Sequence, residues 1–146
     1  MPRYFTLTQA RELLPRVKAL IESAVKAKEQ YQMAEARTQD TVRRVMTLGG
    51  VFIDRAVFQL NRDLQQRSGE RLKSSVEEIH GMGVLVKDLD IGLIDFPTLF
   101  RNEEVYLCWR IGEDDIEWWH GVDEGFGGRK PIDTEFLENH RGQAVE

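Results

Sequence analysis

Apolar residues recur every three or four positions along the first third of the chain, which predicts a long amphipathic helix. Thr6 and Gln9 have the spacing of a capping box, in which each side chain bonds the backbone amide of the other residue, so the helix is expected to begin there. Pro15 removes one backbone donor inside this stretch, which predicts a bend or a local break near residues 11–14. The apolar stripe comprises Leu7, Ala10, Leu14, Val17, Ile21, Ala24 and Tyr31.

A second helical stripe follows Gly49–Gly50, a pair that offers the flexible backbone of a chain reversal. The stripe slips by one residue at Ser68–Gly69, which predicts a kink or short break, and Gly81 and Gly83 suit its C-terminal end. Its members are Ile53, Val57, Leu60, Leu64, Leu72, Val76 and Ile79. The two stripes together predict an antiparallel helical hairpin over about residues 6–82.

After the helices the apolar period changes to two, which predicts β-strands. We expect one β-hairpin from residues 84–89 and 93–96, ended by Pro97, and a second from residues 104–111 and 116–122. The loop of the first hairpin places Lys87 opposite Asp95 and Asp88 opposite Ile94. The loop of the second places Arg110 opposite Glu117 and Trp109 opposite Trp118.

This second register divides the side chains between the two faces of the sheet. One face, expected to pack on the helices, carries Val105, Leu107, Trp109, Ile116, Trp118, His120 and Val122. The other face carries Tyr106, Cys108, Arg110, Glu117 and Trp119. The expected fold is therefore α+β: one domain over residues 1–146, with the helical hairpin, a small antiparallel sheet over about residues 84–132, and a polar, disordered tail over residues 133–146.

The composition is that of a globular protein, with 41% hydrophobic and 31% charged residues. A single cysteine excludes an intrachain disulfide, and the N-terminal residues lack the continuous apolar segment of a signal peptide. No apolar run approaches the ~18 residues of a membrane span. We therefore expect a soluble protein in the reducing cytoplasm.

Charge differs between the two halves of the chain. Residues 1–80 carry 14 Lys and Arg against 10 Asp and Glu, a net of +4, whereas residues 81–146 carry 6 against 15, a net of −9. The acidic second half argues against nucleic acid as a ligand, and the mixed charges of the first half are typical of solvated helices rather than of a membrane-binding patch.

His120 is the one histidine among the predicted strands, and Asp88 lies on a similarly apolar stretch. With Asp95, these residues are candidates for a divalent metal site, or for the base and orienting carboxylate of a hydrolytic site. The structural alternative is a buried His–Asp hydrogen bond that satisfies both groups. It is favoured by the lack of a second His or Cys at ligand spacing.

Two further features have chemical and structural interpretations. Cys108 could act as a nucleophile, but the predicted register points His120 to the opposite face, so a structural thiol is favoured. The glycine-rich residues 125–130 could present amides and two cations to an anion, but they follow no strand-to-helix phosphate pattern, which favours a plain turn.

Several short motifs carry a resemblance to a known family: Phe5-Thr6-Leu7, Leu13-Leu14-Pro15, Val86-Lys87-Asp88-Leu89, Gly92-Leu93-Ile94-Asp95-Phe96-Pro97, Glu104-Val105-Tyr106-Leu107-Cys108-Trp109, Trp119-His120, Gly125-Phe126 and Gly128-Arg129. With these motifs nearly the whole chain resembles the prokaryotic family called domain of unknown function 2203. The resemblance implies the domain boundaries and a prokaryotic cytoplasmic setting. It implies no activity and assigns no catalytic residue.

The sequence thus favours a binding or assembly module that forms a homo-oligomer, expected to be a dimer, through its helical hairpin. Two helices alone leave Leu14, Ile21, Val57 and Leu64 partly covered, and long exposed apolar stripes mark interfaces. The candidate cofactor is a divalent metal ion at the sheet. The alternative is a small metal-dependent hydrolase that uses His120 with Asp88 or Asp95.

Overall fold

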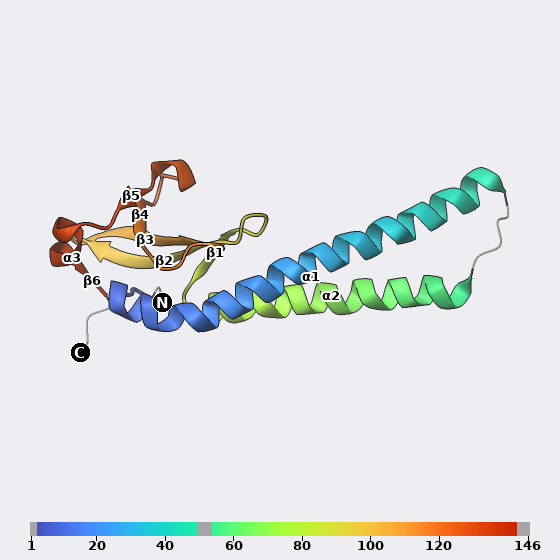
Figure 1. Cartoon of the computed structure of the whole chain (residues 1–146), viewed down its shortest axis with the longest axis horizontal. Coiled ribbons are helices and arrows are strands. Elements are labelled where there is room, and N and C mark those ends of the chain that lie inside the picture. Colours follow the sequence, from blue (N-terminus) through green and yellow to red (C-terminus); the bar gives the residue numbers. More distant parts are fainter. Residues whose placement is uncertain (1–2, 50–53, 143–146) are drawn as a thin grey trace. The chain divides into compact units, whose positions relative to one another are not determined.

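The computed structural model describes residues 3–49 and 54–142 and confirms the α+β class (Figure 1). The chain forms two compact units, one of residues Met1–Glu22 with Val76–Glu146 and the other of residues Ser23–Ser75. Two long helices are followed by short strands: α1 Leu7–Leu48, α2 Arg55–Gly81, β1 Leu85–Asp88, β2 Leu93–Phe100, β3 Glu103–Arg110, β4 Trp118–Gly121, the 3₁₀ turn η1 Phe126–Gly128, β5 Lys130–Pro131, α3 Thr134–Asn139 and β6 His140–Arg141. No helix among the described residues has the length and apolar character needed to cross a membrane.

The capping box at the start of α1 is confirmed. The backbone N–H of Thr6 donates to Gln9 Oε1 at 2.9 Å, and the N–H of Gln9 donates to Thr6 Oγ1 at 3.1 Å. The helix then continues through Pro15 without interruption, so the predicted local break is wrong. One missing hydrogen bond is outweighed because Leu14 and Val17, on either side of the proline, are buried.

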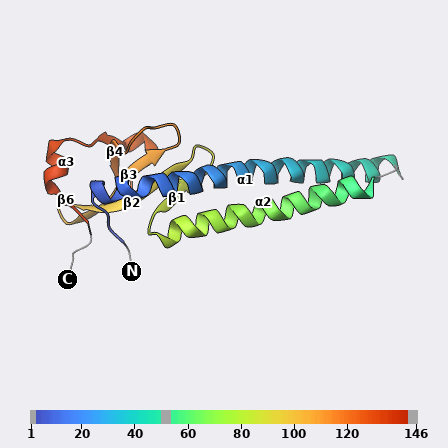
Figure 2. The ribbon, with the colours of Figure 1, turned by 60° about the horizontal axis from the view of Figure 1, so that its bottom comes forward.

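Helix α2 likewise runs through Ser68–Gly69, so the predicted break there is also wrong. The Ser68 hydroxyl points back into the helix and donates to the Leu64 carbonyl at 2.6 Å. Gly69 favours close packing, since a Cβ at this position would lie 3.3 Å from the ring of Tyr31 on α1, which would have to shift slightly. Within the unit of residues Ser23–Ser75, α1 and α2 lie side by side (Figure 2). Of the residues assigned to the reversal and the start of α2, Gly50 and Ile53 lie outside the described residues.

The sheet is antiparallel, with the order β1-β2-β3-β4-β5, and β6 adds to β2. In the first hairpin Leu85 pairs with Asp95 and Val86 with Ile94, and a bulge then brings Asp88 opposite Leu93. The predicted pairings of Lys87 with Asp95 and of Asp88 with Ile94 are therefore wrong. The Asp88 carboxylate accepts the N–H of Asp90 at 2.8 Å and so belongs to the turn rather than to a regular ladder.

Pro97 does not end β2, which continues to Phe100. Pro97 lies opposite Tyr106 of β3, and its carbonyl accepts the N–H of Phe5 at 2.7 Å on the other side of the strand. In a strand the N–H and C=O of one residue point the same way, so the donor that proline lacks would also have pointed away from β3. The β2–β3 ladder therefore loses no hydrogen bond.

The second hairpin is shifted by one residue from its predicted register. Cys108 lies opposite Trp118 and Tyr106 opposite His120, instead of Trp109 opposite Trp118. The connection runs over residues 111–117, because the Glu113 carboxylate accepts the Arg110 N–H at 2.7 Å and Asp115 accepts the Ile116 N–H at 2.8 Å. A shift of one residue turns every side chain of β4 to the other face, so the predicted division of the two faces is wrong for His120, Trp118 and Trp119.

One face of the sheet forms the core with the first turns of α1. Its central side chains are Ile94, Phe96, Leu107 and Trp109, all fully buried. Phe5, just before α1, meets Phe96 edge-on with ring centroids 5.5 Å apart. The opposite face, which we call the polar face, carries Asp95 of β2, Cys108 of β3 and His120 of β4.

Residues 133–142 of the predicted disordered tail are folded. Asp133 caps α3 by accepting the N–H of Phe136, and the Phe136 ring is buried, with centroids 5.0 Å from those of Phe100 and Trp119. His140 then joins β6 and accepts the N–H of Leu7 at 3.0 Å through Nε2. This C-terminal segment therefore completes both the core and the start of α1.

Candidate functional site

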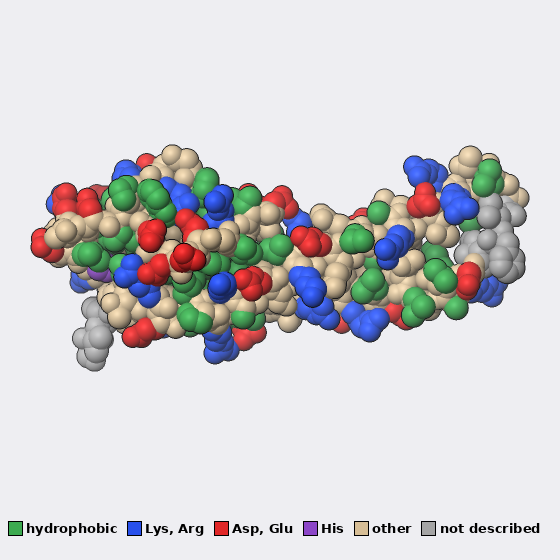
Figure 3. Space-filling model, in the orientation of Figure 1, with side chains coloured by type: hydrophobic (Ala, Val, Ile, Leu, Met, Phe, Trp, Pro, Cys, Tyr) green, Lys and Arg blue, Asp and Glu red, His purple; other side chains and the backbone are tan. Residues whose placement is uncertain are grey.

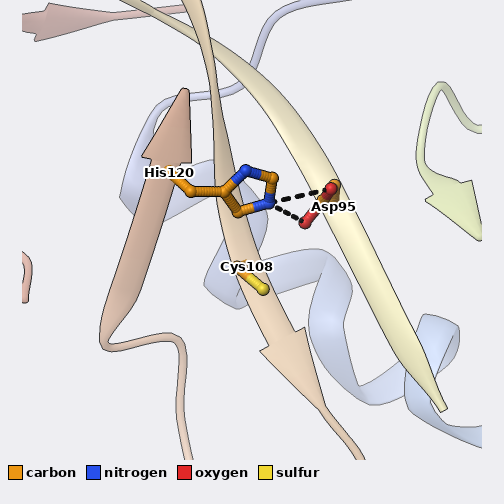
Figure 4. A group of neighbouring side chains, drawn as sticks. All are labelled: Asp95, Cys108 and His120. Carbon is orange, nitrogen blue, oxygen red and sulfur yellow. Dashed lines mark hydrogen bonds and ion pairs between the residues drawn. The ribbon is translucent and has the colours of Figure 1, made fainter. Parts of the chain in front are cut away.

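Asp95, Cys108 and His120 meet on the polar face of the sheet (Figure 4). They come from adjacent strands β2, β3 and β4, where Asp95 lies directly opposite Cys108 and His120 lies opposite Tyr106, two residues along β3 from Cys108. Each residue offers one potential metal-ligand atom, these three atoms lie within 4.8 Å of one another, and all three side chains are buried. We call this group the Asp-Cys-His cluster.

His120 has hydrogen-bond acceptors on both sides of its ring. Its Nε2 lies 3.0 Å from each carboxylate oxygen of Asp95, and its Nδ1 lies 2.8 Å from the carbonyl oxygen of Gly121. A neutral imidazole has one N–H and cannot donate in both directions. When Nδ1 donates to the Gly121 carbonyl, Nε2 of a neutral ring faces the Asp95 carboxylate with its lone pair.

Burial is the main influence on the two acidic members of the cluster. Desolvation raises the pKa of Asp95, although His120 and the neighbouring Cys108 thiol act in the opposite direction. Desolvation and the negative charge of Asp95 raise the pKa of Cys108 to about 12. At neutral pH Cys108 is therefore a thiol that hydrogen-bonds Asp95, and without a metal it is a poor nucleophile.

The structure brings together two of the three predicted ligands. His120 and Asp95 are in contact, whereas Asp88 is exposed and engaged with its own turn. Cys108 was assigned to the face opposite His120, which is wrong because of the register shift. An alternative register with a longer connection would have placed Cys108, His120 and Asp95 on one face.

A cavity of about 310 Å³ adjoins the cluster. Asp95 and His120 form part of its wall, whereas Cys108 lies outside its lining. Val122 and Phe126 contribute apolar surface and are 49% and 39% exposed. Lys87 brings a positive charge, with its Nζ 4.7 Å from the centroid of the Tyr106 ring. A small molecule can therefore approach the Asp95–His120 pair from this side.

The cations of the glycine-rich loop are engaged by carboxylates. Arg129 pairs with both oxygens of Glu113 at 2.8 and 2.6 Å, and Lys130 pairs with Glu124 at 2.5 Å. The guanidinium carbon of Arg129 lies 4.8 Å from the centroid of the Phe126 ring. Because both cations are paired with carboxylates, residues 125–130 are better interpreted as a structural turn held by ion pairs than as an anion-binding loop.

Comparison with known proteins identifies the family of the chain. The model of the family described as "Uncharacterized conserved protein (DUF2203)" matches residues 3–132, which include every residue of the Asp-Cys-His cluster. No curated protein and no solved structure is similar enough to count as a match. The chain therefore belongs to the uncharacterised conserved protein family DUF2203.

Proposed function

We propose that this protein binds a divalent metal ion at Asp95, Cys108 and His120 and acts as a binding module. The observation that carries the proposal is the convergence of a carboxylate, a thiol and an imidazole, from three adjacent strands, within 4.8 Å. Three protein ligands with one open position are typical of catalytic and ligand-binding zinc sites. A thiolate together with an imidazole favours zinc over magnesium or calcium.

The surroundings of the cluster support a metal. The carbonyl of Gly121 accepts from Nδ1 of His120 and so directs Nε2 toward Asp95, which is the orientation that a carbonyl gives to zinc-binding histidines. A dication would balance the charges of a thiolate and a carboxylate. Ligand atoms around tetrahedral zinc lie about 3.3 to 3.8 Å apart, so the cluster needs movements of only about 1 Å to close on an ion.

Elemental analysis of protein purified with zinc should give one ion per chain. His120→Ala and Cys108→Ser should retain none after dialysis, because each removes a ligand. Asp95→Asn should also lose the ion, although its amide can donate to His120 and preserve the fold. Asp88→Asn is the matched control, because Asp88 lies outside the cluster, and it should bind like the wild type. A wild-type protein without stoichiometric metal, or an Asp95→Asn variant that keeps it, would contradict the proposal.

Unfolding in denaturant, with and without a chelator, separates a metal ligand from a structural histidine. If His120 only satisfies the buried Asp95, His120→Ala should lower the free energy of unfolding by about 1 to 3 kcal/mol whether or not chelator is present. If His120 binds metal, the difference between wild type and variant should be largest with zinc and shrink when the ion is removed.

The cavity favours a second candidate, a small metal-dependent hydrolase. Asp95 and His120 line the cavity, so a metal ion held by Asp95, Cys108 and His120 would supply Lewis-acid chemistry next to a substrate bound there. Water bound there would be activated at neutral pH. Ester or phosphoester hydrolysis that is lost both with chelator and in Asp95→Asn would favour this candidate over a binding module.

The proposal also includes self-association through the helical hairpin. Among the described residues of the unit Ser23–Ser75, the buried side chains are small: Ala24, Ala27, Ala34, Ser68 and Ser75. Large apolar side chains remain at the surface, among charged ones (Figure 3): Met33, Val42, Met46, Leu48, Val57 and Leu60. A hairpin with so little core of its own gains stability by covering these side chains with a second copy.

Light scattering at micromolar concentration should therefore give the mass of a dimer. A monomer mass would reject self-association and leave the metal proposal intact. A cytoplasmic, reducing setting belongs to the same proposal, because a metal-binding Cys108 must remain unoxidised.

A further inference from the structure

The two helices of the hairpin leave a groove between them. The groove has a volume of about 800 Å³ and lies entirely within residues Ser23–Ser75. Tyr31 and Thr38 of α1 contribute to its lining, and Phe58 does so from α2. Among the described residues, the Thr38 hydroxyl is buried and has no hydrogen-bond partner.

Five of the polar residues on the α2 side of the groove are spaced symmetrically about one position, whereas Asp63 and Gln65 lie outside this pattern. Arg62 and Glu70 lie four residues before and after Gln66, and Gln59 and Lys73 lie seven before and after it. All five residues line the groove. In an α-helix these spacings place the five side chains on one face, so they form a continuous strip about Gln66.

The charges on the strips of two copies complement each other only when the two α2 helices run in opposite directions. If two copies of α2 pack antiparallel about a two-fold axis at Gln66, Arg62 meets Glu70 of the second copy, and this pair occurs twice. Parallel packing would instead set Arg62 against Arg62 and Glu70 against Glu70. Like charges in contact oppose association, so the antiparallel arrangement is favoured.

We propose that the groove receives the α2 helix of a second copy of this chain, antiparallel and centred on Gln66, with reciprocal Arg62–Glu70 pairs. The arrangement rests on the proposed self-association of the hairpin and specifies one polar contact of that dimer, beside the exposed apolar side chains named above rather than over them. It accounts for the groove, which the two helices of one chain leave open. In this dimer the α1–α2 hairpin of one chain packs against the hairpin of the other. The four helices then resemble a four-helix bundle, in which each hairpin covers one side of the other.

Charge reversal of the full-length protein tests this arrangement. Arg62→Glu creates two Glu–Glu contacts in the dimer, and Glu70→Arg creates two Arg–Arg contacts. For each variant alone, the dissociation constant of the dimer should be about 100-fold higher than that of the wild type, because the like-charge contact occurs twice. Mixing the two variants should restore dimers, since each contact between the different chains is then an Arg–Glu pair. Arg67→Glu is the matched control, because Arg67 is exposed and lies outside the groove, and it should remain dimeric.

Sedimentation velocity of each variant and of the equimolar mixture gives the masses, and circular dichroism verifies that the helices are retained. Monomeric single variants with a dimeric mixture support the antiparallel contact. Single variants that stay dimeric show that self-association uses another surface, and a mixture that stays monomeric shows that Arg62 and Glu70 do not pair; either result overturns the inference. A monomeric wild type overturns the inference and self-association together, but does not affect the metal proposal.

Discussion

Trp109→Ala should lower the free energy of unfolding by about 3 to 5 kcal/mol, a large part of the stability of a domain of this size. The Trp109 side chain is fully buried on the core face of the sheet, and its Nε1–H donates to the Glu113 carbonyl at 3.1 Å. Truncation therefore opens a cavity and also leaves that carbonyl without its donor. Chemical denaturation monitored by circular dichroism would measure the loss.

Trp118 provides the comparison for this substitution. It lies on the opposite face of the sheet, is only partly buried, and has the guanidinium of Arg129 5.1 Å from its ring centroid. Trp118→Ala should therefore lose less, about 1 to 3 kcal/mol. Equal losses at the two positions would contradict the assignment of the two tryptophans to opposite faces.

Phe136→Ala should have a similarly large effect, about 3 to 5 kcal/mol, although the residue lies close to the C-terminal end of the chain. Its ring is buried, stacks on Phe100 and contacts Trp119 and His140. Leu137→Ala, in the same short helix, should have little effect, because Leu137 is 47% exposed.

Ending the chain after Ile132, where the family match stops, should destabilise the protein at least as much as Phe136→Ala. Such a chain lacks the Phe136 ring, the β6 strand on β2 and the His140 acceptor for the Leu7 N–H. Thermal unfolding of the shortened chain compared with Phe136→Ala would test this. A shortened chain as stable as the full protein would show that α3 and β6 do not contribute to the core.

The sequence was sufficient for the helices because their signals are local. The reciprocal bonds of Thr6 and Gln9 and the stripe of apolar residues depend on neighbours within one or two turns. The breaks predicted at Pro15 and Ser68–Gly69 were wrong, because tertiary packing outweighs a local preference: buried side chains flank the proline, and Gly69 admits the Tyr31 ring.

The candidate site was only partly predictable, because it depends on strand register. Alternation along β4 identified His120 as unusual, but its facing depends on how Glu113 and Asp115 bond the backbone of the preceding connection. A pattern of apolar and polar residues does not encode those bonds. For this reason the predicted register places Cys108 on the face opposite His120, and the bulge in β1, which the alternation does not encode, places Asp88 in the turn. The folded segment after residue 132 was missed because a helix as short as α3 shows no periodicity, although Asp133 three residues before Phe136 is a capping signal.

The connection over residues 111–117 has an evolutionary consequence. It sets the face of the sheet on which each β4 side chain lies, so one inserted residue would bring Trp119 opposite Tyr106 in place of His120, and one deleted residue would bring Gly121 there. Most substitutions at the exposed Asp114 would leave the facing of the β4 side chains unchanged. Among descendants of this chain, the length of the connection should therefore vary far less than its composition, and a lineage that changes the length by one should lose the imidazole of the Asp-Cys-His cluster while Asp95 and Cys108 stay paired.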